Sequence, residues 1–231
     1  MKTVGIIGGI GPESTIEYYR SIIDLYQERK KDGSFPSIII NSIDLQKIVA
    51  LITANELETV TDFLCEELGR LVSAGATFGL LAANTPHVVF DEISRKSKIP
   101  LISIVQATCD GAKTLGLKRL GLFGTRFTMQ GRFYPDVFSK ENITLVLPNE
   151  KEQSELHEIY MNELLKGLFR QEARERLLRI AERLKNEERI EGLILGGTEL
   201  PLLLRVAHSL GIPLLDTTQI HVSAIVTELL S

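Results

Sequence analysis

The sequence predicts an α/β fold made of two pseudo-symmetric domains, each a four-stranded parallel sheet flanked by helices. Two observations predict it. Short β-rich runs alternate with helical patterns along the 231 residues, an order typical of parallel sheets built from strand-helix-strand units. Three segments of the first half also recur in the same order in the second half, which indicates two related units.

The expected strands are short apolar runs bounded by turn or polar residues. They lie at residues 3–8, 37–42, 78–83, 101–104, 120–124, 143–147, 192–196 and 213–216. Two amphipathic helices are expected between them. One carries an apolar residue at every third or fourth position from Leu57 to Leu71 and stops before Gly75, and the other is "QEARERLLRIAERLKNEE", residues 171–188.

The internal repeat sets the expected domain boundaries. "VGIIGGIGPESTIEYY" is similar to "LGLFGTRFTMQGRFYP", which aligns Gly5 with Gly121 and Tyr18 with Tyr134. "GLLAANTPH" is similar to "LILGGTELP", and "IPLISI" to "IPLLDT". We therefore expect one domain from residues 1–104 with a returning C-terminal helix in 218–231, and a second domain from residues 105–217.

Charge and composition exclude several classes of function. The chain has 26 Lys and Arg against 30 Asp and Glu, a net charge of −4, without long blocks of one sign. Neither a nucleic acid nor a membrane surface is supported as a partner by this pattern. No apolar stretch is long enough to span a bilayer, so we expect a soluble, cytoplasmic protein.

Cysteine and histidine positions give no sign of a metal or a disulfide. Cys65 and Cys109 both fall inside helical patterns, where we expect them to be small buried hydrophobic residues. The four histidines lack metal-ligand spacing, so no metal is predicted; they are His87, His157, His208 and His221.

Polar motifs follow several of the expected strands. Parallel strands end in loops at one edge of their sheet, and two related halves facing one another would place those edges around one active-site cleft. "GGIGPES", "AANTPH", "GTRFT" and "GGTELP" lie at such edges. The first loop lacks the third glycine of a dinucleotide fingerprint, since Ser14 stands there; the alternative is a tight turn whose N–H groups face a small anion.

The whole chain resembles the aspartate/glutamate racemase family of cofactor-independent amino-acid racemases. The matching stretches are "GIIGGIGPESTIEYY", "NTPH", "LGLFGTRFTMQG", "NELLKGLF", "GTELPLL" and "DTTQIH". The resemblance implies a small amino-acid or dicarboxylate substrate, no cofactor and a homodimer. It also implies two facing cysteines, one removing the α-proton while the other returns a proton to the opposite face.

This sequence departs from the family pattern at both cysteine positions, where Ala83 and Gly197 stand. Neither residue can transfer a proton, so the two-thiol mechanism is not possible. Glu199 and His87 are the candidate substitutes for a one-base exchange. Each also has a structural interpretation, Glu199 as a carboxylate at a helix start and His87 as a hydrogen-bonded residue on a first helical turn. The small residues would also enlarge the cleft, so that a bulkier ligand could fit.

The candidate binding residues are donors that suit a carboxylate. They are Gly9, Ile10, Asn84, Thr85, Thr125, Lys166 and Thr198, with Arg126 as a further candidate. Lys166 is included because the resemblance implies a carboxylate-binding lysine there; the alternative is an ordinary surface lysine. The functions left open are an amino-acid racemase or related isomerase, a non-catalytic protein that binds a small carboxylate, and a different one-base isomerase or lyase.

Overall fold

A computed structural model describes residues 2–204 and 210–231 of the chain. The chain separates into two compact units. Unit 1 comprises Met1–Ile104 and His221–Ser231, and unit 2 comprises Val105–Ile220. His208, one of the four histidines considered as metal ligands, lies outside the described residues.

The sheet of unit 1 is parallel and has the strand order β2-β1-β3. Its strands are β1 (Thr3–Gly8), β2 (Ser37–Ser42) and β3 (Phe78–Leu81). The fourth strand predicted at residues 101–104 is not formed, and that prediction is wrong. Only an isolated bridge joins Leu101 to Gly79, because the next helix already begins at Ile104 and leaves too few residues for a ladder.

The sheet of unit 2 is parallel with the order β5-β4-β6-β7, and here four strands are present as predicted. They are β4 (Arg119–Gly124), β5 (Thr144–Val146), β6 (Gly192–Gly196) and β7 (Leu214–Asp216). In both sheets the first strand of the unit lies between the second and the third. The internal repeat of the sequence therefore corresponds to a repeated topology.

Helices connect the strands. They are α1 (Pro12–Lys30), α2 (Leu45–Thr53), α3 (Leu57–Ser73), α4 (Phe90–Lys96), α5 (Ile104–Thr114), α6 (Arg126–Gln130), α7 (Phe133–Phe138), α8 (Glu150–Asn162), α9 (Gln171–Glu188), α10 (Leu200–Leu204) and α11 (Thr217–Leu230). Short 3₁₀ helices are η1 (Thr85–Val89), η2 (Ser139–Glu141) and η3 (Leu164–Lys166). The helix predicted from the apolar spacing after Leu57 is α3, and residues 171–188 form α9 as predicted. Among the described residues, no helix is both long and apolar enough to cross a membrane.

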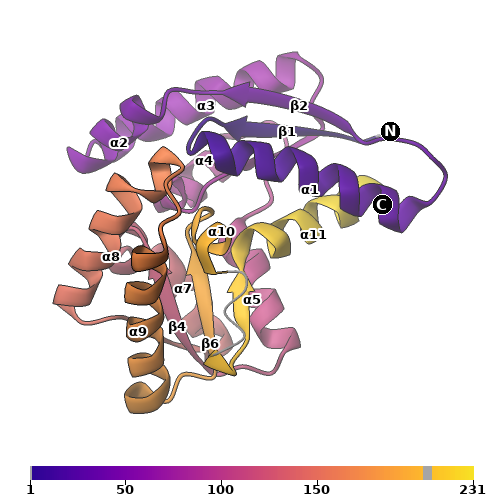
Figure 1. The fold of residues 1–231 in the computed structure, drawn as a ribbon. Helices are drawn as coiled ribbons and strands as arrows, with labels where there is room; N and C mark the ends of the chain where they lie inside the picture. The colour runs from indigo at the N-terminus through magenta and orange to yellow at the C-terminus, as the bar shows by residue number, and fades with distance from the viewer. Residues whose placement is uncertain (1, 205–209) are drawn as a thin grey trace. The chain divides into compact units, whose positions relative to one another are not determined.

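In unit 1, α1 and α11 lie side by side on one face of the sheet (Figure 1). Tyr18 and Ile22 of α1 pack with Val222 and Ile225 of α11 against the apolar side chains of β1 and β3. Arg29 joins the two helices by donating hydrogen bonds to side chains of α11. The C-terminal helix thus completes the core of the N-terminal unit.

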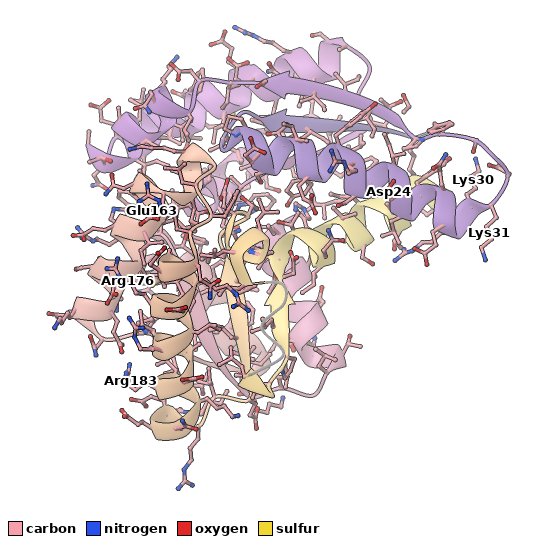
Figure 2. The ribbon with its side chains drawn as sticks, viewed as in Figure 1. Asp24, Lys30, Lys31, Glu163, Arg176 and Arg183 are labelled. Carbon is pink, nitrogen blue, oxygen red and sulfur yellow. The ribbon has the colours of Figure 1, made fainter. Side chains whose placement is uncertain are left out.

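In unit 2, α8 and α9 pack against one face of the sheet through a shared apolar core (Figure 1). Two arginines of α9 hold α8 in place (Figure 2). Arg176 donates to Glu155 at 2.6 Å, and Arg183 forms two bonds with Glu152 at 2.6 and 2.5 Å. The core and these ion pairs together fix the position of α8 and of the side chains that it carries.

Candidate active site at the carboxyl ends of the strands

The predicted site residues follow strands at their carboxyl ends, with one exception. Gly9 and Ile10 follow β1, while Ala83, Asn84 and Thr85 come after β3. In unit 2, Thr125 follows β4, and Gly197, Thr198 and Glu199 follow β6. The exception is Lys166, whose exposed side chain is carried by the last residue of η3.

The glycine loop after β1 is a tight strand-to-helix turn. Gly9 and Gly11 have φ angles of +80° and +100°, which favour glycine. The Gly9 N–H donates to Thr15 Oγ1 at 2.8 Å, and a side chain at Gly9 would collide with the Ile43 backbone. Gly9 therefore shapes the loop, and its own N–H is already used within unit 1.

His87 is bound by backbone groups on both ring nitrogens. The Ile104 N–H donates to Nε2 at 3.3 Å, which leaves Nδ1 to carry the proton and donate to the Ala83 carbonyl at 3.0 Å. The ring stacks on Phe90 and is 2% exposed. Burial, and after it the nearby His221, lower the pKa of His87 to about 3. This geometry favours the structural interpretation of His87 over a role as base.

The edge after β3 is also tied to the first helix. Ser14 is fully buried and its hydroxyl donates to the Ala82 carbonyl at 3.3 Å. Asn84 is 3% exposed and Thr85 is partly exposed. Ser14, at the position where a dinucleotide fingerprint would have glycine, therefore joins the glycine loop to the "AANTPH" segment.

The edge after β4 begins with a capping threonine. The Thr125 side chain accepts a hydrogen bond from the Thr128 N–H and so caps α6. The Arg126 N–H donates to Nδ1 of His157, which lies on α8 and is edge-on to Phe127. Since Nδ1 accepts, Nε2 of the neutral ring carries the proton. Burial, and after it the charge of Arg126, lower the pKa of His157.

The edge after β6 contains a buried polar cluster. The Tyr160 hydroxyl of α8 donates a short hydrogen bond to Glu199 Oε2. The Thr198 hydroxyl donates to the same oxygen at 3.1 Å. All three side chains are at most 4% exposed. Burial and the Glu199 carboxylate raise the pKa of Tyr160 well above its usual value, so the phenol keeps its proton at neutral pH.

Tyr160 also fills the space beside Gly197. A Cβ atom on Gly197 would lie 2.7 Å from the Tyr160 hydroxyl oxygen and closer still to a ring carbon. The expectation that glycine leaves room for a bulkier ligand is therefore wrong at this position, because the aromatic ring takes the room that the missing side chain leaves.

Neither cysteine of the chain has the properties of a reactive thiolate. Cys65 lies on α3 and is partly exposed, and Cys109 lies on α5 and is buried. Burial raises the pKa of both thiols, to about 11 for Cys109. Both are therefore protonated at neutral pH. In residues 2–204 and 210–231, no group of three His, Cys, Asp or Glu side chains could hold a metal ion.

Tyr160 and His157 were not among the residues that the sequence indicated. They stand three positions apart on α8, a spacing that places two side chains on one side of a helix. Tyr160 also fits the apolar period set by Leu156 and Ile159. That pattern indicates a buried ring, but it gives no sign that the hydroxyl reaches Gly197 and Glu199.

Comparison with known proteins identifies the class to which this fold and site belong. The model of the Asp/Glu/Hydantoin racemase family matches residues 7–225, so the chain belongs to this family. The resemblance inferred from the sequence motifs is thereby confirmed.

Solved structures agree with this family over the full length. A candidate Asp/Glu racemase from Yersinia pestis is 32% identical with a TM-score of 0.90, each chain being covered completely. An aspartate racemase homologue from Pyrococcus horikoshii OT3 is 33% identical with a TM-score of 0.85, again over both whole chains. The α/β fold of this chain is therefore the fold of Asp/Glu racemase structures.

One curated relative matches part of the chain. The broad-specificity amino-acid racemase RacX of Bacillus subtilis (strain 168) is 28% identical over 138 residues. The match spans 58% of this chain and 59% of that protein, less than two thirds of its length.

Proposed function

We propose that this racemase-family protein catalyses α-proton exchange, the half-reaction of an amino-acid isomerase, on a small amino acid or dicarboxylate without a thiol and without a cofactor. The observation that carries the proposal is the buried Tyr160–Thr198–Glu199 cluster at the end of β6. This cluster puts a carboxylate next to position 197, where the sequence resemblance implies a cysteine in the family.

The binding half of the proposal rests on the polar residues that the chain keeps. A substrate carboxylate requires N–H or O–H donors or a cation. We assign this role to Ile10, Asn84, Thr85, Thr125 and Lys166, while Thr198 supports Glu199, to which its hydroxyl already donates. Gly9 contributes through the shape of its loop, since its N–H already donates to Thr15. Because RacX is described as broad in specificity, aspartate and glutamate are tested beside neutral amino acids.

The catalytic half follows from which side chains can accept a proton. Ala83 and Gly197 cannot, and both nitrogens of His87 are engaged by the backbone. Glu199 is the carboxylate of the cluster, so we assign it as the base that takes up the proton released in the reaction. With a base on one face only, the proton returns to the face from which it left.

The test is α-proton exchange in heavy water, followed by NMR on a panel of L- and D-amino acids. We expect at least one amino acid to incorporate deuterium at the α-carbon faster than in a protein-free control, and E199Q to abolish the gain. Binding without exchange for every member of the panel would overturn the proposal in favour of a non-catalytic carboxylate-binding protein.

The remaining expectations concern the state of the protein in the cell. We propose a cytoplasmic homodimer, as the family resemblance and the charge pattern indicate. Sedimentation velocity tests the dimer directly, and a monomer at micromolar concentration would overturn it. Full activity after dialysis against a chelator is the expected result for a reaction that needs no metal.

A further inference from the structure

We infer that the Tyr160 hydroxyl, hydrogen-bonded to Glu199, is the group that exchanges a proton with the substrate, in the place that the side chain of a cysteine at position 197 would take. The inference rests on the proposed function and adds a catalytic residue to it. Nothing in the sequence motifs of the family points to Tyr160.

The Tyr160 phenol fills the space next to Gly197. A side chain on residue 197 would begin at a Cβ that lies 2.7 Å from the Tyr160 hydroxyl oxygen and 2.9 Å from Cζ. Real Cβ atoms do not approach other heavy atoms so closely. The phenol therefore occupies the volume into which a reactive side chain at position 197 would project, and the glycine is what makes room for it.

The polar contacts give the phenol a partner for proton transfer. Its hydroxyl donates to Glu199 Oε2, and Thr198 donates to that oxygen as well. Two donors on one carboxylate oxygen stabilise the charged carboxylate. The pair is thus arranged with the proton on the phenol and the negative charge on Glu199.

Helix α8 holds the phenol rigidly. Asn149 and Glu152 form a capping box at its start, and Arg176 and Arg183 pair with its acidic side chains. The Tyr160 ring packs with Leu156 and other apolar residues of the unit 2 core. A group held by packing and hydrogen bonds needs little reorganisation during proton transfer.

The step is balanced as a transfer of two protons. The Cα–H bond of the substrate breaks, and its proton forms a new O–H bond at Tyr160. The original phenolic proton moves to Glu199 Oε2, which becomes a carboxylic acid. The electron pair stays on the substrate as a carbanion stabilised by its carboxyl group, and the reverse step returns a proton, or a deuteron from solvent, to the same face.

The experiment compares α-proton exchange in heavy water for the wild type, Y160F and the control Y134F. Tyr134 is a second fully buried tyrosine of unit 2, on α7, and it has no part in the proposed site. Y160F keeps the ring and loses only the hydroxyl. We expect exchange to fall by about 100-fold or more in Y160F, the usual scale for loss of an acid–base group, and to stay within about threefold in Y134F.

Two further readouts separate chemistry from structure. Saturation-transfer NMR tests whether Y160F still binds the amino acid, and thermal unfolding tests whether it is folded. A merely structural tyrosine would change the unfolding temperature and leave exchange per folded molecule intact.

The outcomes distinguish this inference from the proposed function. Exchange by the wild type that is lost in Y160F and kept in Y134F supports both. Equal exchange by the wild type and Y160F overturns the role of Tyr160 and leaves the proposed function standing. Absence of exchange in the wild type overturns both.

Discussion

Tyr160 and Gly197 occupy a single space in unit 2, since a Cβ on Gly197 would lie 2.7 Å from the Tyr160 hydroxyl oxygen. The ring is held there by a hydrogen bond to Glu199 and by core packing. The glycine at position 197 and the buried tyrosine are therefore parts of one arrangement. A side chain at position 197 and the phenol exclude each other unless one of them moves.

Gly197→Ala is expected to destabilise the protein by about 1–3 kcal/mol, the usual cost of overpacking, because the phenol must move away from Glu199. Urea unfolding measures the change. Gly69→Ala is the matched control: Gly69 lies within α3 with nothing within 4 Å of its Cβ position, so this change should stabilise by about 0.5–1 kcal/mol. In the double variant Y160A/G197A the cost of the alanine should largely disappear. Additive effects of the two changes would contradict a shared space.

Placing cysteines at positions 83 and 197, where the sequence resemblance implies them, should give racemisation only when Tyr160 is shortened as well. The variant A83C/G197C is expected to be inactive or poorly folded, because the new thiol at residue 197 meets the phenol. A83C/G197C/Y160A has room for both thiols and should convert an L-amino acid to its D-form. Chiral chromatography measures the conversion, and A83C/Y160A, with a single thiol in the site, is the control. Equal racemisation with and without Tyr160 would show that the ring does not block position 197.

Stability should fall as the pH decreases from about 7 to 4.5. Burial lowers the pKa of His221 to about 4, and burial together with His221 lowers that of His87 to about 3. Both stay neutral when folded but take up protons when unfolded, below about 6.5. The unfolded state therefore binds more protons in this window, so stability is fully present above pH 6.5 and is lost on acidification.

The measurement is the free energy of unfolding in urea at several pH values. Two histidines give a slope of up to about 2.7 kcal/mol per pH unit. His221→Gln should reduce this slope to about half, because it removes one of the two histidines that take up a proton on unfolding. An unchanged stability from pH 7 to 4.5 would show that these histidines are already protonated in the folded protein.

Asn149→Ala should cost about 1 kcal/mol, because Asn149 caps α8 and forms a capping box with Glu152. Urea unfolding gives the size of the loss, and amide hydrogen exchange should show faster opening of the first turn of α8. Ser154→Ala on the same helix removes only a bond to the Glu150 carbonyl and should change little. Equal effects of the two changes would argue against the cap.

Much of the fold followed from local patterns. Helices α3 and α9 could be predicted from the sequence. Their amphipathic spacing and their end signals depend only on residues that are close together along the chain. The fourth strand of unit 1 could not be judged in this way. "LISI", residues 101–104, has the composition of a strand, but the helix that begins at Ile104 shortens it to a bridge at Leu101. Where one element ends is set by competition with the next.

The candidate site was predictable in part for the same reason. Asn84, Thr125, Thr198 and Glu199 follow strands directly, so the sequence pattern places them at a sheet edge. Tyr160 lies in the last turn of α8, and its contact with Glu199 depends on how α8 packs against the sheet. No local spacing encodes such a contact, which is why the room beside Gly197 was wrongly expected to be open.

The most direct test of the account is the fate of the α-proton when the unmodified protein is incubated with single enantiomers of amino acids in heavy water. NMR measures deuterium at the α-carbon, and chiral chromatography of the same samples measures inversion. We expect deuterium incorporation with retention of configuration, because proton transfer takes place on one face only. No deuterium in any amino acid, or inversion as fast as incorporation, would contradict it.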